Sequence, residues 1–170
     1  HKGDVANAIA DLAWVARTEP GNAEARYELG LAYSRQPRRE DAVAEFTAAL
    51  QVEPDMVKAL VNRSAALFQL GRVEEAIADC DAALRLDPYN ASVLVNRGVF
   101  HAQLGRRAQA VADWTSAILV NPQFPGGYFS RGVDHGQHGE LPEAIADLSK
   151  VLELRPDHTA ARQGRAAAHA

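Results

Sequence analysis

Histidine and cysteine side chains are the groups of this sequence best suited to metal binding or nucleophilic chemistry. His135 and His138 lie three residues apart, the spacing of one helix face, and His101 and His158 lie on either side of them in the sequence. A zinc site needs three or four such ligands at close range. Cys80, the one cysteine, would be reactive only if a nearby base or cation stabilised its thiolate. What these groups can do depends on the elements that carry them.

Sequence motifs of common enzymes are absent. The sequence holds no glycine-rich phosphate loop and no Gly-x-Ser-x-Gly nucleophile motif. No arrangement of paired carboxylates marks a catalytic cleft. We therefore predict a protein that is not an enzyme and that needs no cofactor.

The composition is typical of a folded, soluble chain. The 170 residues are 47% hydrophobic and 24% charged, with a formal net charge of -4. The chain has no basic excess for nucleic-acid binding and no apolar run of about 18 residues for membrane insertion. A single cysteine cannot form an internal disulfide, which favours a reducing compartment and hence the cytoplasm. High alanine and an excess of arginine over lysine are typical of a GC-rich, bacterial genome.

A period of 34 residues organises the sequence, and 170 residues equal five such periods. Prolines recur at this step: Pro20, Pro54, Pro88, Pro122 and Pro156. Three other positions recur in phase with them: Ala8, Ala42, Ala76, Ala110 and Ala144; Ile9, Val43, Ile77, Val111 and Ile145; Leu12, Phe46, Cys80, Trp114 and Leu148. Such a period indicates a repeat architecture.

Each period contains two amphipathic helices joined by a tight turn. Apolar residues from Ala76 to Leu84 are related by helical steps of three, four and seven. Between the helices stand Gly71, Gly105 and Gly139, which can adopt the left-handed conformation that ends a helix. The repeating unit is therefore predicted to be a helix-turn-helix.

The chain resembles the tetratricopeptide repeat family, whose 34-residue unit has small and large residues at fixed positions and a proline near its end. With that proline at position 32, residues 57–90 place Ser64 and Ala76 at small positions 8 and 20, and Leu67 and Cys80 at large positions 11 and 24. Residues 23–56 match equally well, with Gly30 at position 8. The resemblance spans nearly the whole chain.

The resemblance implies an all-α fold, a right-handed α-solenoid superhelix forming a single domain over residues 1–170. Full repeats are expected at 23–56, 57–90, 91–124 and 125–158, after a second helix in 1–22 and before a first helix in 159–170, which is either part of a repeat or a cap. The resemblance also implies that the first helices line the concave face.

The repeat register argues against the metal and nucleophile hypotheses. His101 and His135 occupy position 11 of successive repeats, so they are expected about 8–10 Å or more apart, the distance at which helices pack. Core or surface histidines are therefore favoured over a zinc site. Cys80 occupies a large core position, which favours a buried, inert thiol.

The expected concave wall combines an apolar stripe with uncharged polar side chains. Amides donate and accept, so they can bind the backbone of an extended peptide while the stripe takes its alternate side chains. The alternative is that these amides are only solvated or bonded to a neighbouring helix. The expected groove residues are Tyr27, Leu31, Val61, Asn62, Ala65, Gln69, Val95, Asn96, Val99, Gln103, Phe129, Ser130, Val133 and Gln137.

One known activity of the family is not predicted. Its carboxylate-clamp repeats grip the C-termini of heat-shock chaperones through lysine and arginine at set positions of the first helices. Here Tyr27 and Leu31, or Val61 and Ala65, stand where the clamp begins, and Lys58 alone does not replace the missing cations.

A ladder of charges also follows the period. Acidic side chains at position 23 could pair with arginines at position 7, and we expect pairing with the preceding repeat; binding of an acidic ligand is the alternative. The ladder consists of Glu45, Asp79, Asp113 and Asp147 with Arg63, Arg97, Arg131 and Arg165.

The resemblance implies a protein–protein interaction scaffold that binds a peptide segment of a partner protein. Two alternatives stay open: a recruiting arm of a larger enzyme, and a module that self-associates end to end. The last follows from the partial repeats, which should leave Leu12 and Val15 uncovered at one end and Ala161 and Ala166 at the other. A segment of a longer solenoid is favoured over a repeat that the partial repeats of two molecules complete together.

Overall fold

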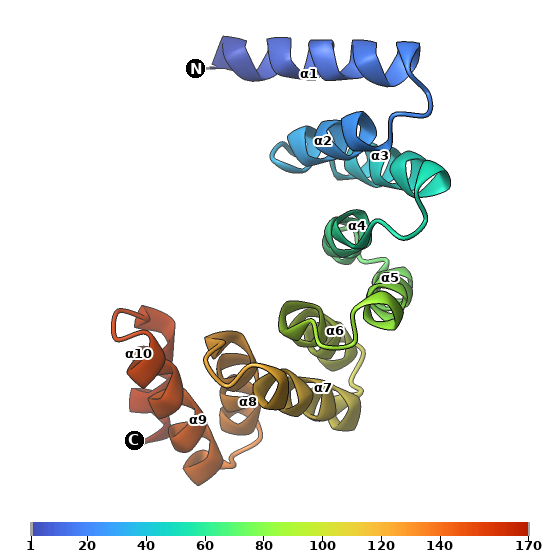
Figure 1. The fold of residues 1–170 in the computed structure, drawn as a ribbon. Helices are drawn as coiled ribbons and strands as arrows, with labels where there is room; N and C mark the ends of the chain where they lie inside the picture. The colour runs from blue at the N-terminus through green and yellow to red at the C-terminus, as the bar shows by residue number, and fades with distance from the viewer. Residues whose placement is uncertain (1, 170) are drawn as a thin grey trace. The chain divides into compact units, whose positions relative to one another are not determined.

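The computed structural model describes residues 2–169, and side chains from Asn7 to His169. Within this range the chain forms ten α-helices and no strand, which confirms the all-α class (Figure 1). Each expected full repeat contains one helix pair. The helices are α1 (Lys2–Thr18), α2 (Ala23–Ser34), α3 (Arg39–Val52), α4 (Val57–Gln69), α5 (Val73–Leu86), α6 (Ala91–Gln103), α7 (Arg107–Val120), α8 (Pro125–Gln137), α9 (Leu141–Leu154) and α10 (Thr159–Ala168).

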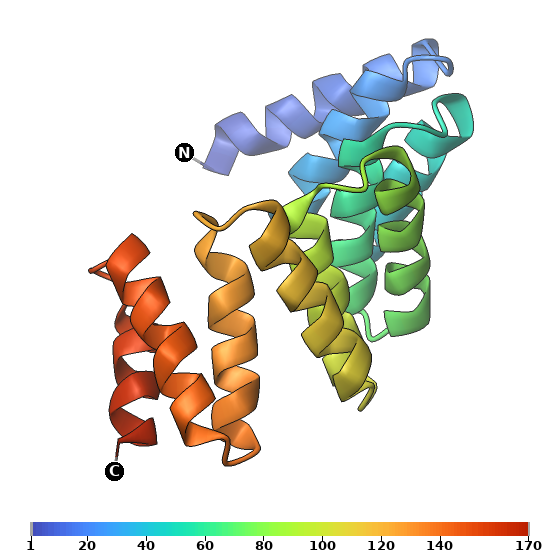
Figure 2. The ribbon, with the colours of Figure 1, turned by 60° about the horizontal axis from the view of Figure 1, so that its bottom comes forward.

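The helices form two compact units, His1–Pro88 with α1 to α5 and Tyr89–Ala170 with α6 to α10. Within unit 1, α2 packs on α1 and α3, and α4 packs on α3 and α5. Within unit 2, α8 contacts α6, α7, α9 and α10, and Figure 2 shows α8, α9 and α10 side by side.

Glycines close three of the first helices. Gly71, Gly105 and Gly139 have φ values of 77°, 71° and 75°, a conformation that strains any residue with a Cβ. The amide after each glycine bonds back to the helix, as Arg72 N does to Leu67 O at 2.9 Å. This is the Schellman pattern, and it confines each turn to a few residues.

Side-chain caps begin three other helices. Asn22 Oδ1 accepts from Ala25 N at 2.9 Å at the start of α2, and Asn90 Oδ1 accepts from Val93 N at 3.2 Å at the start of α6. His158 Nδ1 accepts from Ala161 N at 3.2 Å at the start of α10. His158 therefore works as an N-cap, a role more often filled by Asn, Asp, Ser or Thr.

The two helices of a pair approach closely because position 8 is small. A Cβ built on Gly98 would lie 2.4 Å from Trp114 Nε1, and one on Gly30 would lie 2.7 Å from the Phe46 ring. In α4 the same position is Ser64, which is fully buried, and position 24 of that pair is the smaller Cys80. The residues thus compensate in size: glycine accompanies a large partner and serine a small one.

The partial repeats differ in how they are covered. Leu12 and Val15 of α1 are half-buried, whereas the equivalent Phe46 and Ala49 of α3 are completely buried. In α10, Ala166 is exposed, but Ala161 is completely buried against Leu148 and Val151. The expectation that Ala161 would be uncovered was wrong, because α10 packs on α9 through this residue.

Candidate peptide-binding groove

Charged pairs fix the helices that carry the candidate groove. Three arginines of the first helices each bond both carboxylate oxygens of an aspartate in the second helix of the same repeat, with Nη2–Oδ1 distances of 2.6, 2.6 and 2.9 Å. The pairs are Arg63–Asp79, Arg97–Asp113 and Arg131–Asp147. The expected pairing with the preceding repeat was therefore wrong for these arginines.

For Arg63, Arg131 and Arg165, a hydroxyl at position 25 provides the link to the preceding repeat. Arg63 Nη1 donates to Thr47 Oγ1 at 3.1 Å, and Arg131 Nη1 donates to Thr115 Oγ1 at 3.0 Å. Arg165 Nη1 donates to Ser149 Oγ at 3.3 Å. One guanidinium thus joins two helices of its own repeat to the helix before them, which its fixed fork of donors allows.

Glu45 follows a different pattern, because position 7 of its repeat is Leu29. Its carboxylate accepts from Arg26 Nη1 at 3.0 Å, and Arg26 also bonds Ala16 O of α1 at 3.2 Å. The ladder residues thus bond to other side chains of the fold. Asp147 raises the pKa of Arg131 because it accepts hydrogen bonds from the guanidinium.

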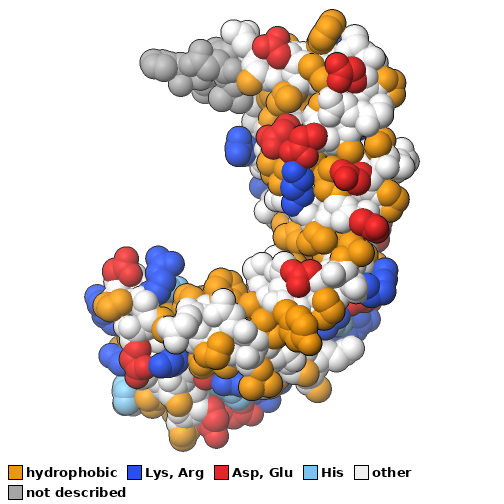
Figure 3. Space-filling view, viewed as in Figure 1, with side chains coloured by type: hydrophobic (Ala, Val, Ile, Leu, Met, Phe, Trp, Pro, Cys, Tyr) orange, Lys and Arg blue, Asp and Glu red, His pale blue; other side chains and the backbone are white. Residues whose placement is uncertain are grey.

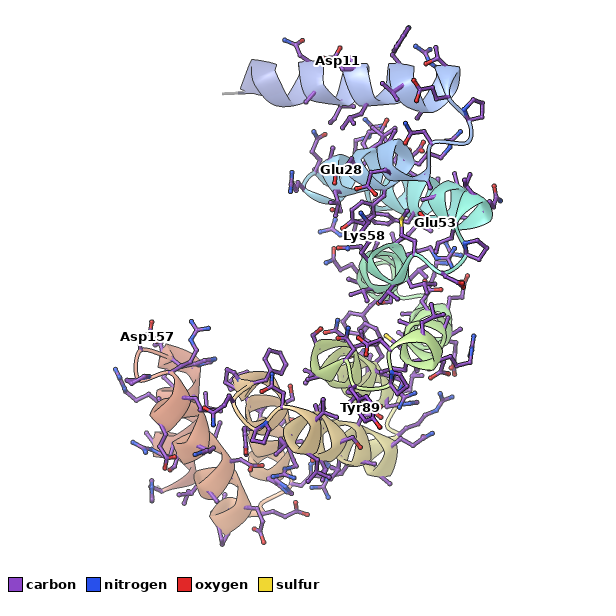
Figure 4. The ribbon with its side chains drawn as sticks, viewed as in Figure 1. Asp11, Glu28, Glu53, Lys58, Tyr89 and Asp157 are labelled. Atoms are coloured by element: carbon purple, nitrogen blue, oxygen red, sulfur yellow. The ribbon has the colours of Figure 1, made fainter. Side chains whose placement is uncertain are left out.

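In unit 1, charged residues cover part of the expected groove wall. Tyr27 is only 8% exposed, and Lys58 Nζ lies 4.5 Å above its ring. Lys58 in turn forms a salt bridge of 2.6 Å with Glu24. Figure 3 shows acidic and basic side chains side by side over α2 and α4, where Figure 4 labels Glu28 and Lys58. Tyr27 therefore contributes to the core more than to an open surface.

The amides of this wall bond to the protein itself. Asn62 Nδ2 donates to Lys58 O at 2.8 Å and to Tyr27 Oη at 3.3 Å. Gln69 is exposed, and its Oε1 accepts from Arg39 Nε. Both donor hydrogens of Asn62 are thus engaged, which agrees with the alternative interpretation for this residue. Leu31, Val61 and Ala65 are half-buried.

In unit 2, a groove of about 340 Å³ lies between α6 and α8, with Trp114 of α7 at its base. Six of the eight residues expected for the wall of this unit line it together; Val95 and Asn96 are half-buried and lie outside the lining. Ala102, Trp114 and Asp134 were not expected there. The lining consists of Val99, Ala102, Gln103, Trp114, Phe129, Ser130, Val133, Asp134 and Gln137.

An ion-pair network, which we call the α7–α8 clasp, holds one wall of this groove. It consists of Arg107, Asp134, His135 and Glu140. Arg107 Nε donates to Asp134 Oδ2 at 2.7 Å and Nη1 donates to Glu140 Oε1 at 2.9 Å, while His135 Nδ1 bonds Glu140 Oε2. Arg107 and then His135 hold the pKa of Glu140 at about 2. The sequence signal for the clasp was Glu140, which replaces an arginine present at this position in the three other full repeats.

The histidines do not converge on one point. His135 bonds Glu140, and His138 Nδ1 donates to Asp134 O at 2.8 Å. His101 is buried, and its Nε2 lies 3.9 Å from Asp113 Oδ2. Over the part of the chain with described side chains, no three His, Cys, Asp or Glu residues are placed to hold a metal ion. Cys80 is buried in α5.

A second groove continues from the first along unit 2. It has a volume of about 240 Å³ and lies between α8 and α10, and it shares Val133 and Gln137 with the groove between α6 and α8. Its lining consists of Gly132, Val133, Gly136, Gln137, Leu141, Leu148, Gly164, Ala167 and Ala168. Sequence analysis missed this groove because glycine and alanine offer few atoms for chemistry.

None of the described helices combines the length and the apolar character that crossing a bilayer requires.

Comparisons with known proteins identify the repeat family. A family model of the tetratricopeptide repeat matches residues 2–42, 33–91 and 96–159. A crystal structure of MamA is 24% identical, with a TM-score of 0.83 over 91% of each chain. YrrB, described as a TPR protein with an unusual peptide-binding site, is 19% identical, with a TM-score of 0.72 over 93% of this chain and 81% of that one.

A further structure is the first TPR of Spaghetti (RPAP3), bound to the HSP90 peptide SRMEEVD. It is 27% identical and has a TM-score of 0.63, over 66% of this chain and 90% of that one. No curated protein sequence matches the chain.

Proposed function

The chain belongs to the tetratricopeptide repeat family, and on this premise we propose that it is a non-catalytic scaffold that binds an extended peptide segment of a partner protein. The proposal rests mainly on the groove between α6 and α8, in which six expected residues from two repeats line one cavity. Two structures of the same fold, one described as having a peptide-binding site and one bound to a peptide, support peptide binding.

The lining of this groove suits a peptide backbone with uncharged side chains. Gln103 and Gln137 are both exposed, and their amides offer a donor and an acceptor on each side of the groove. Val99, Phe129 and Val133 present apolar surface between them. Backbone groups of an extended segment would bond the amides while its side chains contact the apolar residues.

The groove suits an internal segment and not the C-terminus of a chain. No lysine or arginine is among the nine residues that line it. Arg107, which pairs with the lining residue Asp134, also bonds Glu140. A terminal carboxylate would therefore have no charged donor in this groove.

Val133→Asp tests this function, with Leu119→Asp as the matched control. Val133 lines the groove, whereas Leu119 of α7 is 76% exposed and lies outside the lining. The probe is a peptide selected on the folded chain from a random display library, and its affinity is measured by fluorescence polarisation. Val133→Asp should weaken binding at least about tenfold, or ~1.4 kcal/mol, because it places a charge among apolar contacts.

Leu119→Asp should leave the affinity unchanged. Circular dichroism of both variants verifies that the helices are intact. Equal affinity of Val133→Asp and the wild-type chain would contradict a groove between α6 and α8.

A further inference from the structure

We propose that the groove between α8 and α10 anchors one aromatic side chain of the partner peptide. This inference rests on the proposed function and specifies the chemistry of its ligand. The groove between α6 and α8 would hold neighbouring residues of the same peptide.

The size and polarity of this second groove suit an aromatic ring. Its volume is about 240 Å³, and an apolar cavity of about 150 Å³ in another protein binds benzene. Its nine lining residues include no charged side chain, and Gln137 alone among them is polar. A charged occupant would lose its hydration without gaining a partner, so the lining selects an uncharged apolar group.

Gly136 leaves this groove open, although neither close packing nor the backbone conformation requires a glycine at this position. A Cβ built there would meet only Ala144 Cβ, at 3.8 Å, which is ordinary contact. Its φ is not positive, so alanine could adopt the same backbone conformation, and alanine has the higher helix propensity. By contrast, a Cβ on Gly132 would lie 3.0 Å from Asp147 Cβ, so close packing explains that glycine.

The equivalent residues of the other first helices all have side chains. Position 12 is Ser34 in α2, Phe68 in α4 and Ala102 in α6. The one residue of this series without a side chain stands where the groove opens. Because this glycine lowers the helix propensity of α8 and packing does not require it, the space beside it points to an occupant.

The two grooves form one continuous surface, because Val133 and Gln137 line both. Neighbouring helices pack about 8–10 Å apart, and an extended chain advances about 3.3 Å per residue. The aromatic residue would therefore stand two or three residues from the one held between α6 and α8. Gln137, on the wall between the grooves, would bond the peptide backbone between these two residues.

The first experiment tests the pocket with a small probe. N-acetyl-phenylalaninamide is titrated into the isotope-labelled chain, and N-acetyl-alaninamide serves as the control. The backbone amide signals of Gly136, Gly164 and Ala168 should shift saturably with the aromatic probe only. Absence of these shifts, or equal shifts with both probes, would overturn the proposal.

Gly136→Met and Gly136→Ala provide the matched variants. Methionine should fill the groove and abolish the shifts at Gly164 and Ala168. Alanine should raise the unfolding midpoint, because it restores helix propensity, and still narrow the groove and weaken the probe's binding. If the shifts persist with methionine at position 136, the pocket is not the binding site.

The second experiment separates this inference from the proposed function. Ala102→Met fills the groove between α6 and α8 at the position equivalent to Gly136. Both methionine variants should weaken the selected peptide about tenfold or more. Loss of affinity in Ala102→Met alone would refute the aromatic anchor and leave the scaffold function standing. Unchanged affinity in both variants would refute both.

Discussion

The first helices of the two units use the same repeat positions in different ways. In unit 1, Lys58 at position 2 lies over Tyr27 and pairs with Glu24, while Asn62 bonds inward. In unit 2, position 2 holds Ser92 and Gly126, and two adjoining grooves are present. Equivalent positions thus do not make equally available surfaces. Charged side chains at the helix start can cover a wall that short residues leave accessible.

Removing the base of the groove should have the largest effect. Trp114→Ala deletes a side chain that is 3% exposed and contacts Gly98, so it should cost about 3–5 kcal/mol of unfolding free energy. Phe46→Ala in unit 1 should cost a similar amount. Urea unfolding measures both losses.

Peptide binding then distinguishes the units. At temperatures where both variants stay folded, Trp114→Ala should also weaken the selected peptide, whereas Phe46→Ala should not. Equal weakening by the two variants would show that the site is not confined to unit 2.

Breaking an arginine–aspartate pair should have the next largest effect, and a similar one in both units. Arg131→Met leaves Asp147, which is 7% exposed, without its charged partner and should cost about 1.5–3 kcal/mol. Arg63→Met removes the equivalent contacts with Asp79. A cost below about 0.5 kcal/mol in either variant would contradict a structural role for the ladder.

The α7–α8 clasp should make the stability of unit 2 depend on pH. Folding lowers the pKa of Glu140 from 4.5 to about 2. The carboxylate therefore stabilises the fold above pH 4.5, and this contribution is lost as the pH falls from about 4.5 to about 2. Glu140→Gln should lower the thermal midpoint near neutral pH and converge with the wild-type chain near pH 2.

Unit 1 supplies the control for this pH effect. Arg72 stands at the position equivalent to Glu140, and its pair with Glu75 is exposed, with side chains 46% and 57% accessible. Arg72→Gln should change the midpoint little at any pH, since solvent screens exposed pairs. A pH-independent difference for Glu140→Gln would contradict the clasp.

The sequence predicted the fold well because the residues that determine the fold recur with a fixed period. Prolines, turn glycines and small residues at position 8 each recur every 34 residues, and each acts on local backbone or on the nearest helix. Whether each arginine pairs within its own repeat or with the preceding repeat was not predictable in this way. Arg63 had acidic candidates both in its own repeat, Asp79, and in the preceding one, Glu45, and only the helix geometry distinguishes them.

The lining of the candidate site was predictable where it depends on side chains that recur and not where it depends on their absence. Gln103 and Gln137 indicated the groove between α6 and α8 because both occupy position 13 of their repeats. Gly136 and Gly164 gave no such signal, since a groove made of missing atoms is visible only in three dimensions. The clasp occurs once, so no period pointed to it.

Position 2 provides the most specific test of the comparison, with the smallest effect on stability. Lys58→Ser gives unit 1 the residue that α6 has at Ser92, and it removes both the salt bridge with Glu24 and the cover over the Tyr27 ring. The unfolding midpoint should hardly change, because the salt bridge is exposed and screened. The Tyr27 ring should become accessible, which a soluble paramagnetic probe detects as faster relaxation of its ring protons.

Glu28→Ser, on the same helix as Tyr27 but outside this contact, should leave that relaxation unchanged. If Lys58→Ser also leaves it unchanged, then packing of Tyr27 against Phe46, and not the charged cover, closes the wall of unit 1.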